Sequence, residues 1–327
     1  MTGSFLEVKN LKTHFFTRYG TVKAVDGVSF SVKRGETLGL VGESGCGKSI
    51  TCRSILRLVP YPAGRIVGGE ILLEGKDLLQ MKDDEMRKIR GDKIAMILQD
   101  PMTSLNPVFR IEKQLSEGIR IHTHLKKRDI WERACELMKS VRIPAPEMRL
   151  KDYPHQLSGG MRQRVVGAIA LSSEPALLIA DEPTTSLDTT IQAQFLNLLL
   201  GLQRQLGLSM IVVTHDFGVV ARICNEVAVM YAGKIVEKAA VREIFNHPMH
   251  PYTRAMMDAV PKVEERVDRL ASIDGQPPSL YSLPKGCAFR DRCQYVIPKC
   301  QIEEVPPLVE TKPGHLVRCW KSEPNNE

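Results

Sequence analysis

One stretch of the chain has the residue types and spacing of a phosphate-binding loop, or P-loop. It follows the pattern G-x-x-x-x-G-K-S and consists of Gly42, Glu43, Ser44, Gly45, Cys46, Gly47, Lys48 and Ser49. Its glycines allow the backbone to bend closely around phosphate oxygens and to point successive N–H groups inward. Lys48 is suited to reach the β- and γ-phosphates of a nucleotide, and the Ser49 hydroxyl is suited to ligate Mg²⁺.

The residues around this loop predict the elements that must hold it. The apolar run at 37–41 predicts a buried strand, and residues 50–58 predict a helix. A strand, the loop and a helix in this order are the context that the motif requires. The helix N-terminus adds an electric field that favours anions. The alternative is a glycine-rich turn that matches the pattern by chance, and this context argues against it.

Two acidic residues follow another apolar run. Residues 176–181 end in Asp181, and Glu182 comes next. A continuous apolar run predicts a central parallel strand. Asp181 is then placed to hold Mg²⁺ through water, and Glu182 to polarise a water for attack on the γ-phosphate. Two surface acids at a strand end are the alternative, and the P-loop favours hydrolysis over it.

A second glycine pair begins another predicted helix. The run is Leu157, Ser158, Gly159, Gly160, Met161, Arg162, Gln163 and Arg164. Such a helix start can bind an anion, although this one has no lysine. One chain does not need two such loops for one phosphate group. The second loop makes sense if it contacts the γ-phosphate of a nucleotide held by another subunit. The alternative is a glycine-rich helix start without a ligand.

The remaining pattern predicts an α/β protein with an inserted helical region. Residues 5–15 and 22–32 predict two antiparallel strands, with a turn at Asp26-Gly27 in the second. Residues 66–73, 93–99 and 209–215 predict further strands, and 191–206 a helix. Helical spacing from 111 to 142 predicts a helical subdomain at about 100–170. Strands alternating with helices imply a mostly parallel sheet covered on both faces.

Composition excludes some classes of protein. Of the 327 residues, 43% are hydrophobic and 25% charged, which is an ordinary globular balance. No apolar run approaches the roughly 20 residues of a membrane-spanning helix. The first residues lack the basic and apolar regions of a signal peptide, so we expect the chain to stay in the cytosol. The net charge of +7 suits nucleotides or an anionic membrane surface, but most of it should be solvated.

The end of the chain differs in composition and carries a cysteine cluster. After residue 260 periodicity fades, which predicts a boundary between a domain at 1–260 and an extension at 261–327. Four of the eight cysteines gather there: Cys287, Cys293, Cys300 and Cys319. A cytosolic chain should not depend on disulfides. The spacing lacks the Cys-x-x-Cys pairs of zinc ribbons, yet four thiolates suit a metal site. An iron–sulfur cluster, zinc and free thiols are the alternatives.

The run at 157–164 resembles the signature sequence of ATP-binding cassette (ABC) ATPases. Other motifs of that family follow in its order over residues 5–260. Tyr19 resembles the aromatic residue that stacks on adenine, and Gln99 resembles the Q-loop glutamine. His215 resembles the switch histidine, and Ser186-Leu187-Asp188 resembles the D-loop. The family more often has Ala at the position of Ser186 and Thr at the position of Ile50.

The resemblance implies a fold and a set of site residues. The fold is a RecA-like α/β core with an antiparallel β-subdomain, an inserted helical subdomain and a small C-terminal extension. Glu182, His215 and Gln99 become the expected catalytic residues, and Ser49, Gln99 and Asp181 the expected Mg²⁺ ligands. The residues expected to bind ATP are Tyr19, Gly42, Ser44, Gly45, Cys46, Gly47, Lys48, Ser49, Ile50, Gln99, Ser158, Gly159, Gly160, Asp181, Glu182, Asp188 and His215.

Two further stretches resemble peptide and nickel importers within that family. They lie at 100–107 and 246–253, and the tail resembles the extension of the same group. The resemblance implies a hydrolysing subunit for import of dipeptides or short oligopeptides. Nickel or another small solute is the alternative cargo. The resemblance also favours a 4Fe–4S cluster at Cys287, Cys293, Cys300 and Cys319.

The same resemblance implies an assembly. A second, homologous ATPase subunit would form a heterodimer with this chain beneath two membrane permeases. A periplasmic or lipid-anchored protein would deliver the substrate, and no nucleic acid would be involved. The chain would lie on the cytoplasmic face of the inner membrane. Rival interpretations are a non-transport ABC protein, an exporter and a subunit that binds ATP without hydrolysing it. The intact Glu182 and signature run argue against the last.

Overall fold

The computed structural model describes residues 4–123, 125–185, 187–260, 272–302 and 304–322. The chain forms two compact units. Unit 1 comprises residues 1–31, 38–79 and 214–327, and unit 2 comprises residues 32–37 and 80–213. Each unit is described by itself. None of the helices in the described ranges is long and apolar enough to cross a membrane.

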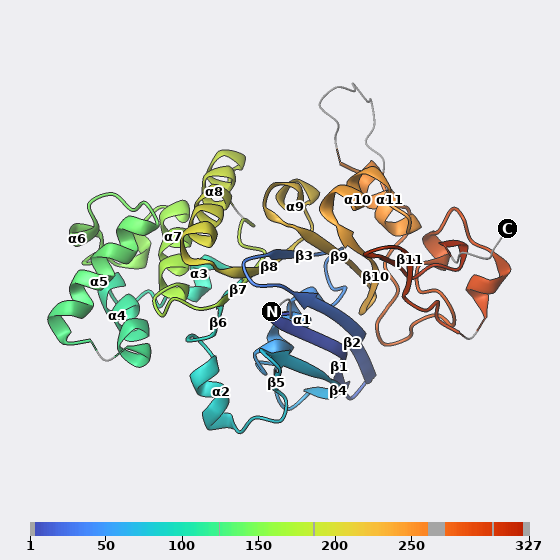
Figure 1. Cartoon of the computed structure of the whole chain (residues 1–327), viewed down its shortest axis with the longest axis horizontal. Coiled ribbons are helices and arrows are strands. Elements are labelled where there is room, and N and C mark those ends of the chain that lie inside the picture. The colour runs from blue at the N-terminus through green and yellow to red at the C-terminus, as the bar shows by residue number, and fades with distance from the viewer. Residues whose placement is uncertain (1–3, 124, 186, 261–271, 303, 323–327) are drawn as a thin grey trace. The chain divides into compact units, whose positions relative to one another are not determined.

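Unit 1 contains a sheet formed mainly by the N-terminal strands. Its strand order is β2-β1-β4-β5 (Figure 1). Strands β1 and β4 run antiparallel, with Leu6 opposite Leu73. Apolar side chains alternate with polar ones along β1, so one face of the sheet is buried. The bounds are β1 Leu6–Thr17, β2 Gly20–Val32, β4 Gly64–Leu73 and β5 Lys76–Asp77.

A second group of strands in unit 1 carries the phosphate-binding loop. Strand β3 is buried along its length and pairs in parallel with β9, which in turn pairs antiparallel with β10. Strand β12 extends this group on β10, and β11 pairs with β12. The strand bounds are β3 Thr37–Val41, β9 Glu226–Tyr231, β10 Lys234–Ala240, β11 Val309–Lys312 and β12 His315–Val317. The helix bounds are α1 Lys48–Ile55, α9 Phe217–Ile223, α10 Val241–Asn246 and α11 Pro251–Asp258.

One hydrophobic cluster joins these strands to the C-terminal segment. Val41, Val229 and Tyr231 from the strands pack in the same cluster as Tyr252 of α11 and Phe289 of the segment after 272. The Tyr231 and Phe289 rings meet edge to face at 5.3 Å between centroids. The cluster ties the C-terminal segment to the strand that leads into the P-loop. The division predicted at residue 260 stays a prediction, since residues 261–271 lie outside the described part.

Unit 2 is built on parallel strands and a group of helices. Strand β7 pairs in parallel with β6 on one side and with β8 on the other, as the apolar run at 176–181 predicts. The strand bounds are β6 Ile94–Ile97, β7 Leu177–Asp181 and β8 Ser209–Thr214. The helix bounds are α2 Asp83–Ile89, α3 Pro101–Ser104, α4 Ile111–His122, α5 Lys127–Ser140, α6 Pro146–Arg149, α7 Gly159–Ala170 and α8 Thr189–Leu206.

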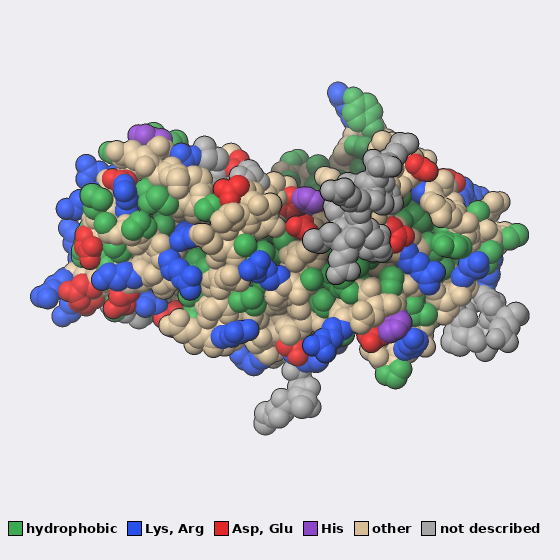
Figure 2. All heavy atoms as spheres, turned by 90° about the horizontal axis from the view of Figure 1, so that it is seen from above, with side chains coloured by type: hydrophobic (Ala, Val, Ile, Leu, Met, Phe, Trp, Pro, Cys, Tyr) green, Lys and Arg blue, Asp and Glu red, His purple; other side chains and the backbone are tan. Residues whose placement is uncertain are grey.

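The surface of the helical part of unit 2 carries both signs of charge. Figure 2 shows Lys and Arg side chains interspersed with Asp and Glu side chains over the end that holds α4, α5 and α6. Along α5, Arg128 pairs with Glu132, and Arg133 pairs with Glu136. Exposed pairs of this kind contribute little to stability. The mixture is typical of a solvated surface.

One local prediction was wrong. The turn expected at Asp26-Gly27 lies inside β2, which continues to Val32. Gly27 has φ +79°, so it bends the strand without ending it. Asp26 is held there by Lys234, whose Nζ lies 2.7 Å from the Asp26 carboxylate. The pair and the backbone bond from Asp26 to Gly233 keep β2 against the end of β9 and the start of β10.

Candidate functional site

The P-loop residues lie between β3 and α1 in unit 1, as the strand–loop–helix context predicts. Lys48 is 4% exposed, and its Nζ donates to the carbonyl oxygens of Gly42 at 2.6 Å and Glu43 at 2.9 Å. The ammonium group is therefore held against the backbone of its own loop. Carbonyl contacts of this kind can be exchanged for phosphate oxygens without moving the backbone far. The loop thus has a cation placed for an anionic ligand.

Two glycines of the loop are required by close backbone approach. A Cβ on Gly42 would lie 2.3 Å from the Met230 carbonyl oxygen. A Cβ on Gly47 would lie 2.2 Å from the Ala24 carbonyl oxygen, and Gly47 has φ +107°. A side chain at either position would force the backbone apart. The loop backbone can therefore pack tightly against neighbouring strands, which keeps its amide groups in the compact arrangement that binds a phosphate.

Cys46 is a buried cysteine of the loop, 5% exposed. Burial raises the pKa of its thiol, although the nearby Lys48 opposes this. The thiol therefore stays protonated at neutral pH, and it packs as a small apolar group. Its carbonyl oxygen accepts a bond from Gly233 N–H at 2.9 Å. Ser44, Gly45, Ser49 and Ile50 complete the loop and the first turn of the helix.

Tyr19 lies at the turn between β1 and β2 in unit 1. Its side chain is 72% exposed, and the Arg18 guanidinium carbon lies 4.6 Å from its ring centroid. The turn is fixed by the Tyr19 N–H, which donates to the Thr17 hydroxyl at 3.2 Å. An exposed ring on an ordered turn is available for stacking.

His215 comes directly after β8 and is exposed. Asp216 follows it and caps helix α9, because its carboxylate accepts the Gly218 N–H at 2.7 Å. The Asp216 N–H donates in turn to the Thr214 hydroxyl at 3.0 Å. The first of these bonds lies in the cap of α9 just after His215, and the second spans His215, so together they fix the backbone that carries the imidazole.

Unit 2 brings Gln99 and Glu182 together. The Gln99 amide donates to the Glu182 carboxylate at 2.8 Å, and the Thr185 hydroxyl donates to the same oxygen at 3.1 Å. Glu182 has φ +46°, a left-handed conformation that is rare outside glycine. Such strain occurs where the surrounding structure fixes it, and the Glu182 N–H donates to Val213 at 2.9 Å. Asp181 precedes it at the end of β7 and is 1% exposed.

The signature residues begin helix α7 in unit 2. Ser158 is the N-cap, and its hydroxyl accepts the Met161 N–H at 3.3 Å. Gly159 has open space where a Cβ would point, so nothing in the described structure requires glycine there. A Cβ on Gly160 would lie 2.8 Å from Ile191 of α8. Gly160 therefore allows α7 and α8 to approach each other, and Ser158 and Gly159 remain on the surface.

Asp188 caps helix α8, which follows the D-loop residues. Its carboxylate accepts the Ile191 N–H at 2.9 Å. An N-cap of this kind is worth about 1 kcal/mol to a helix. Ser186, the neighbouring residue at which the sequence departs from the family pattern, lies outside the described residues.

The four tail cysteines lie near one another but do not form a ligand set. The Cys287 N–H donates to the Cys300 carbonyl oxygen at 3.0 Å. Burial, with the other three thiols as smaller causes, raises the pKa of Cys287 to about 11. Burial also raises the pKa of Cys293 and Cys319. Within the described residues, no group of three or more His, Cys, Asp or Glu side chains is placed to hold a metal ion. The structure therefore gives the predicted iron–sulfur cluster no support.

The predicted site residues thus fall into two sets. Unit 1 holds Tyr19, Gly42, the residues from Ser44 to Ile50 and His215, and unit 2 holds Gln99, Ser158, Gly159, Gly160, Asp181, Glu182 and Asp188. Two residues were missed by sequence reasoning. Thr185 contacts the Glu182 carboxylate, and Glu43 is bonded to the C-terminal segment. Thr185 could have been found from the two threonines, Thr184 and Thr185, that follow Glu182 closely. Glu43 could not, because the P-loop pattern allows any residue type at its position.

Comparison with known proteins gives two family matches. Residues 25–185 match the family described as ABC transporter. Residues 236–300 match the family described as oligopeptide/dipeptide transporter, C-terminal region. The second match includes α11 and three of the four tail cysteines.

Individual proteins match over nearly the whole chain. A probable peptide ABC transporter ATP-binding protein of Sinorhizobium fredii is 50% identical over 97% of this chain and 95% of its own length. The dipeptide transport ATP-binding protein of Lactococcus lactis is 50% identical, over 98% and 91%. The oligopeptide transport ATP-binding protein OppD of Bacillus subtilis is 49% identical, over 98% and 89%. Among solved structures, the ATP-binding cassette MJ0796, a dimer bound to ADP and Pi, has a TM-score of 0.65 at 27% identity. That match covers 72% of this chain and 99% of the cassette.

Proposed function

We propose a function from one premise, which is that this chain belongs to the peptide-transport ATP-binding proteins of the ABC transporter family. Members of this family hydrolyse ATP, and the chain is the ATPase subunit of a peptide importer. Its fold is the ABC cassette fold. The P-loop carries this conclusion, because its two crowded glycines and buried Lys48 form a cradle for phosphates.

The roles of the individual residues are our proposal. Lys48 and the loop amides bind the phosphates, and Tyr19 stacks on the adenine ring. Ser49, Asp181 and Gln99 are the residues that would hold Mg²⁺, which neutralises phosphate charge when bound. Glu182 acts as the general base toward water. The bond from Gln99 to Glu182 supports this, because it orients the carboxylate that would take the proton.

The signature residues act at a second nucleotide. Ser158, Gly159 and Gly160 lie at a helix start on the surface, where they can reach a nucleotide held by another cassette. Asp188 lies at the neighbouring helix start, and His215 supports the γ-phosphate in its own chain. The dimeric form of the solved cassette MJ0796 supports a two-cassette assembly. The proposed mate is a homologous but distinct ATPase subunit.

The chain works with membrane permeases, as ATP-binding subunits of importers do. We place it on the cytoplasmic face of the inner membrane, with two permeases and a periplasmic or lipid-anchored substrate-binding protein. Dipeptides or short oligopeptides are the proposed cargo, because the relatives are named for both. Nickel or another small solute remains the alternative that transport measurements must exclude.

The decisive experiment uses the assembled complex. We would purify this chain with the proteins that accompany it from membranes, identify them by mass spectrometry and reconstitute them in vesicles. ATP hydrolysis should rise when a dipeptide and the binding protein are supplied, and labelled dipeptide should accumulate inside. Stimulation by nickel and not by peptide would contradict the peptide assignment.

The iron–sulfur cluster remains a proposal about the tail. Four cysteines within a short segment support it, although the described structure contains no formed ligand group. Anaerobically purified protein should be brown and contain iron and sulfide, and Ser at Cys287, Cys293, Cys300 or Cys319 should remove the colour. Ser at Cys46, Cys52, Cys135 or Cys224 should not. If metal analysis finds one zinc per chain, the site is a zinc site and not an iron–sulfur cluster. If it finds no metal, the four cysteines are free thiols.

A further inference from the structure

Glu43 of the P-loop is held from the C-terminal part of unit 1. Its carboxylate receives two bonds from the Arg292 guanidinium, Nη1 to Oε2 at 2.8 Å and Nη2 to Oε1 at 2.9 Å. Its backbone N–H donates to the Tyr252 hydroxyl at 2.9 Å. Its carbonyl oxygen accepts from Lys48 at 2.9 Å. Three of the groups on this one residue are thus engaged, two of them by residues more than 200 positions later in the chain.

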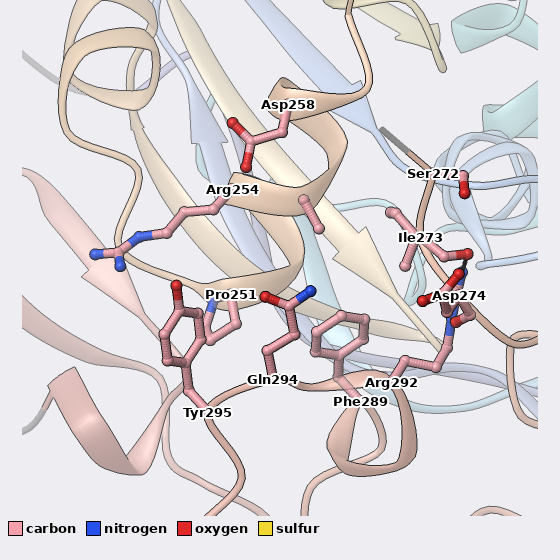
Figure 3. A pocket seen from close by; sticks show the side chains of 11 residues that line it. Pro251, Arg254, Asp258, Ser272, Ile273, Asp274, Phe289, Arg292, Gln294 and Tyr295 are labelled. Carbon is pink, nitrogen blue, oxygen red and sulfur yellow. Dashed lines mark hydrogen bonds between the residues drawn. The ribbon is translucent and has the colours of Figure 1, made fainter. Parts of the chain in front are cut away.

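The Arg292–Glu43 pair is partly buried and geometrically defined. The Arg292 side chain is 5% exposed and that of Glu43 27%. Arg292 also donates from Nε to the Asp274 carbonyl at 3.0 Å, so its position is fixed independently of Glu43. Figure 3 shows its side chain running toward Asp274 beside Phe289. The bonds to Glu43 are the main cause that raises the pKa of Arg292 above its usual value. A two-bond pair fixed in this way is stronger than an ordinary surface ion pair.

Tyr252 holds the backbone of the same residue. It is fully buried, and its ring packs against Tyr231 at 4.6 Å and Phe289 at 5.4 Å between centroids. Its hydroxyl reaches the loop from a rigid helix start, because His250 accepts the Tyr252 N–H at 3.0 Å and caps α11. The Glu43 peptide is therefore oriented by a group that cannot move without disturbing the core.

Because Glu43 is charged, its contacts with Arg292 and Tyr252 can affect nucleotide binding. A carboxylate in a phosphate-binding loop repels the anionic ligand unless a cation neutralises it. Arg292 supplies that cation, and Tyr252 fixes the peptide whose carbonyl contacts Lys48. We propose that Arg292 and Tyr252 are positioning residues for the P-loop, through which the C-terminal part of unit 1 sets the nucleotide affinity of the cassette. The proposal depends on the proposed ATP-binding function.

The test measures binding of a fluorescent ATP analogue by the full-length chain, without partners or turnover. Arg292→Met should weaken binding about tenfold, because Glu43 keeps its charge and loses its cation. Tyr252→Phe, which removes the hydroxyl alone, should weaken it about two- to tenfold. Arg290→Met is the matched control, since Arg290 lies in the same turn but bonds to Asp291 and the Lys285 carbonyl. It should bind like wild type.

A double variant separates charge from structure. Glu43→Gln alone should bind at least as tightly as wild type, and combined with Arg292→Met it should restore affinity to within about twofold. A double variant as weak as Arg292→Met would overturn the charge argument. Unchanged affinity in both Arg292→Met and Tyr252→Phe, with thermal unfolding like that of Arg290→Met, would overturn the whole inference. Wild-type protein that binds no ATP would refute the proposed function instead.

Discussion

At the scale of single residues, Glu182 is the side chain on which the proposed chemistry depends. Its strained backbone and its bonds from Gln99 and Thr185 hold one carboxylate oxygen in place. Glu182→Gln keeps the shape and the acceptor oxygen but removes the base. We expect phosphate release by the assembled transporter to fall by about a hundredfold or more, with ATP binding retained. Glu174→Gln, at a surface acid paired with Arg133, is the control. Turnover near the wild-type rate would refute the assignment.

Residue types and spacing were enough to propose most of the candidate site but not all of its contacts. The P-loop, Gln99, the Asp181-Glu182 pair and the signature glycines could be predicted because each lies in a short, local pattern. The partner of Glu43 could not be predicted, because Arg292 lies 249 positions away and a single arginine belongs to no recognisable sequence pattern. The left-handed backbone of Glu182 was equally hidden, because tertiary contacts impose it against the preference of the residue.

At the scale of elements, the segments with a clear apolar run or period were predicted correctly, whereas β9, β10 and the short strands β11 and β12 were not predicted. Helices α4, α5, α7 and α8 and strands β4, β6, β7 and β8 lie where the apolar spacing put them. Strand β12 spans Leu316 and its two neighbours, too few residues for a period to appear. It is held on β10 by a buried hydrogen bond between His315 Nε2 and the Glu237 carboxylate, at 2.7 Å.

The buried groups beside β10 make this region sensitive to acid. Burial lowers the pKa of His250 to about 4. Burial raises the pKa of Glu237, but bonds from His315, Thr253, Met249 and His250 outweigh it and leave that pKa below its usual value. As the pH falls, His250 and Glu237 therefore bind protons in the unfolded state before they do so in the folded state. Stability is therefore fully present above about pH 6.5 and falls as the pH drops toward 4.

Urea unfolding at two pH values tests this. Protonation of His250 alone should lower the free energy of unfolding by about 3 kcal/mol between pH 7.5 and pH 4. His250→Asn, which keeps an acceptor for the Tyr252 N–H, should flatten most of the pH dependence. His247→Gln, at an exposed residue paired with Glu243, should leave it unchanged. A wild-type free energy of unfolding that stays constant over this range would contradict the prediction.

At the scale of the whole molecule, the signature residues should act on a nucleotide that the chain does not itself hold. Ser158→Arg places a bulky cation at an exposed helix start. We expect nucleotide binding by the isolated chain to be unaffected, and hydrolysis by the assembled two-cassette complex to fall by about tenfold or more. The wild-type chain alone should be a poor ATPase. Ser140→Arg, at the end of α5, is the control. Full activity from a monomer at any concentration would refute the two-cassette arrangement.

The bond between Glu43 and Arg292 also orders events during synthesis of the chain. The ribosome makes Glu43 early, and Arg292 follows 249 residues later. At about 5 to 20 residues per second, the delay is about 10 to 50 seconds. Until Arg292 is made, the Glu43 carboxylate lacks this cation, so we expect an unfinished cassette to bind ATP more weakly than a finished one. Translation that stops before Arg292 therefore releases chains that compete poorly for the nucleotide.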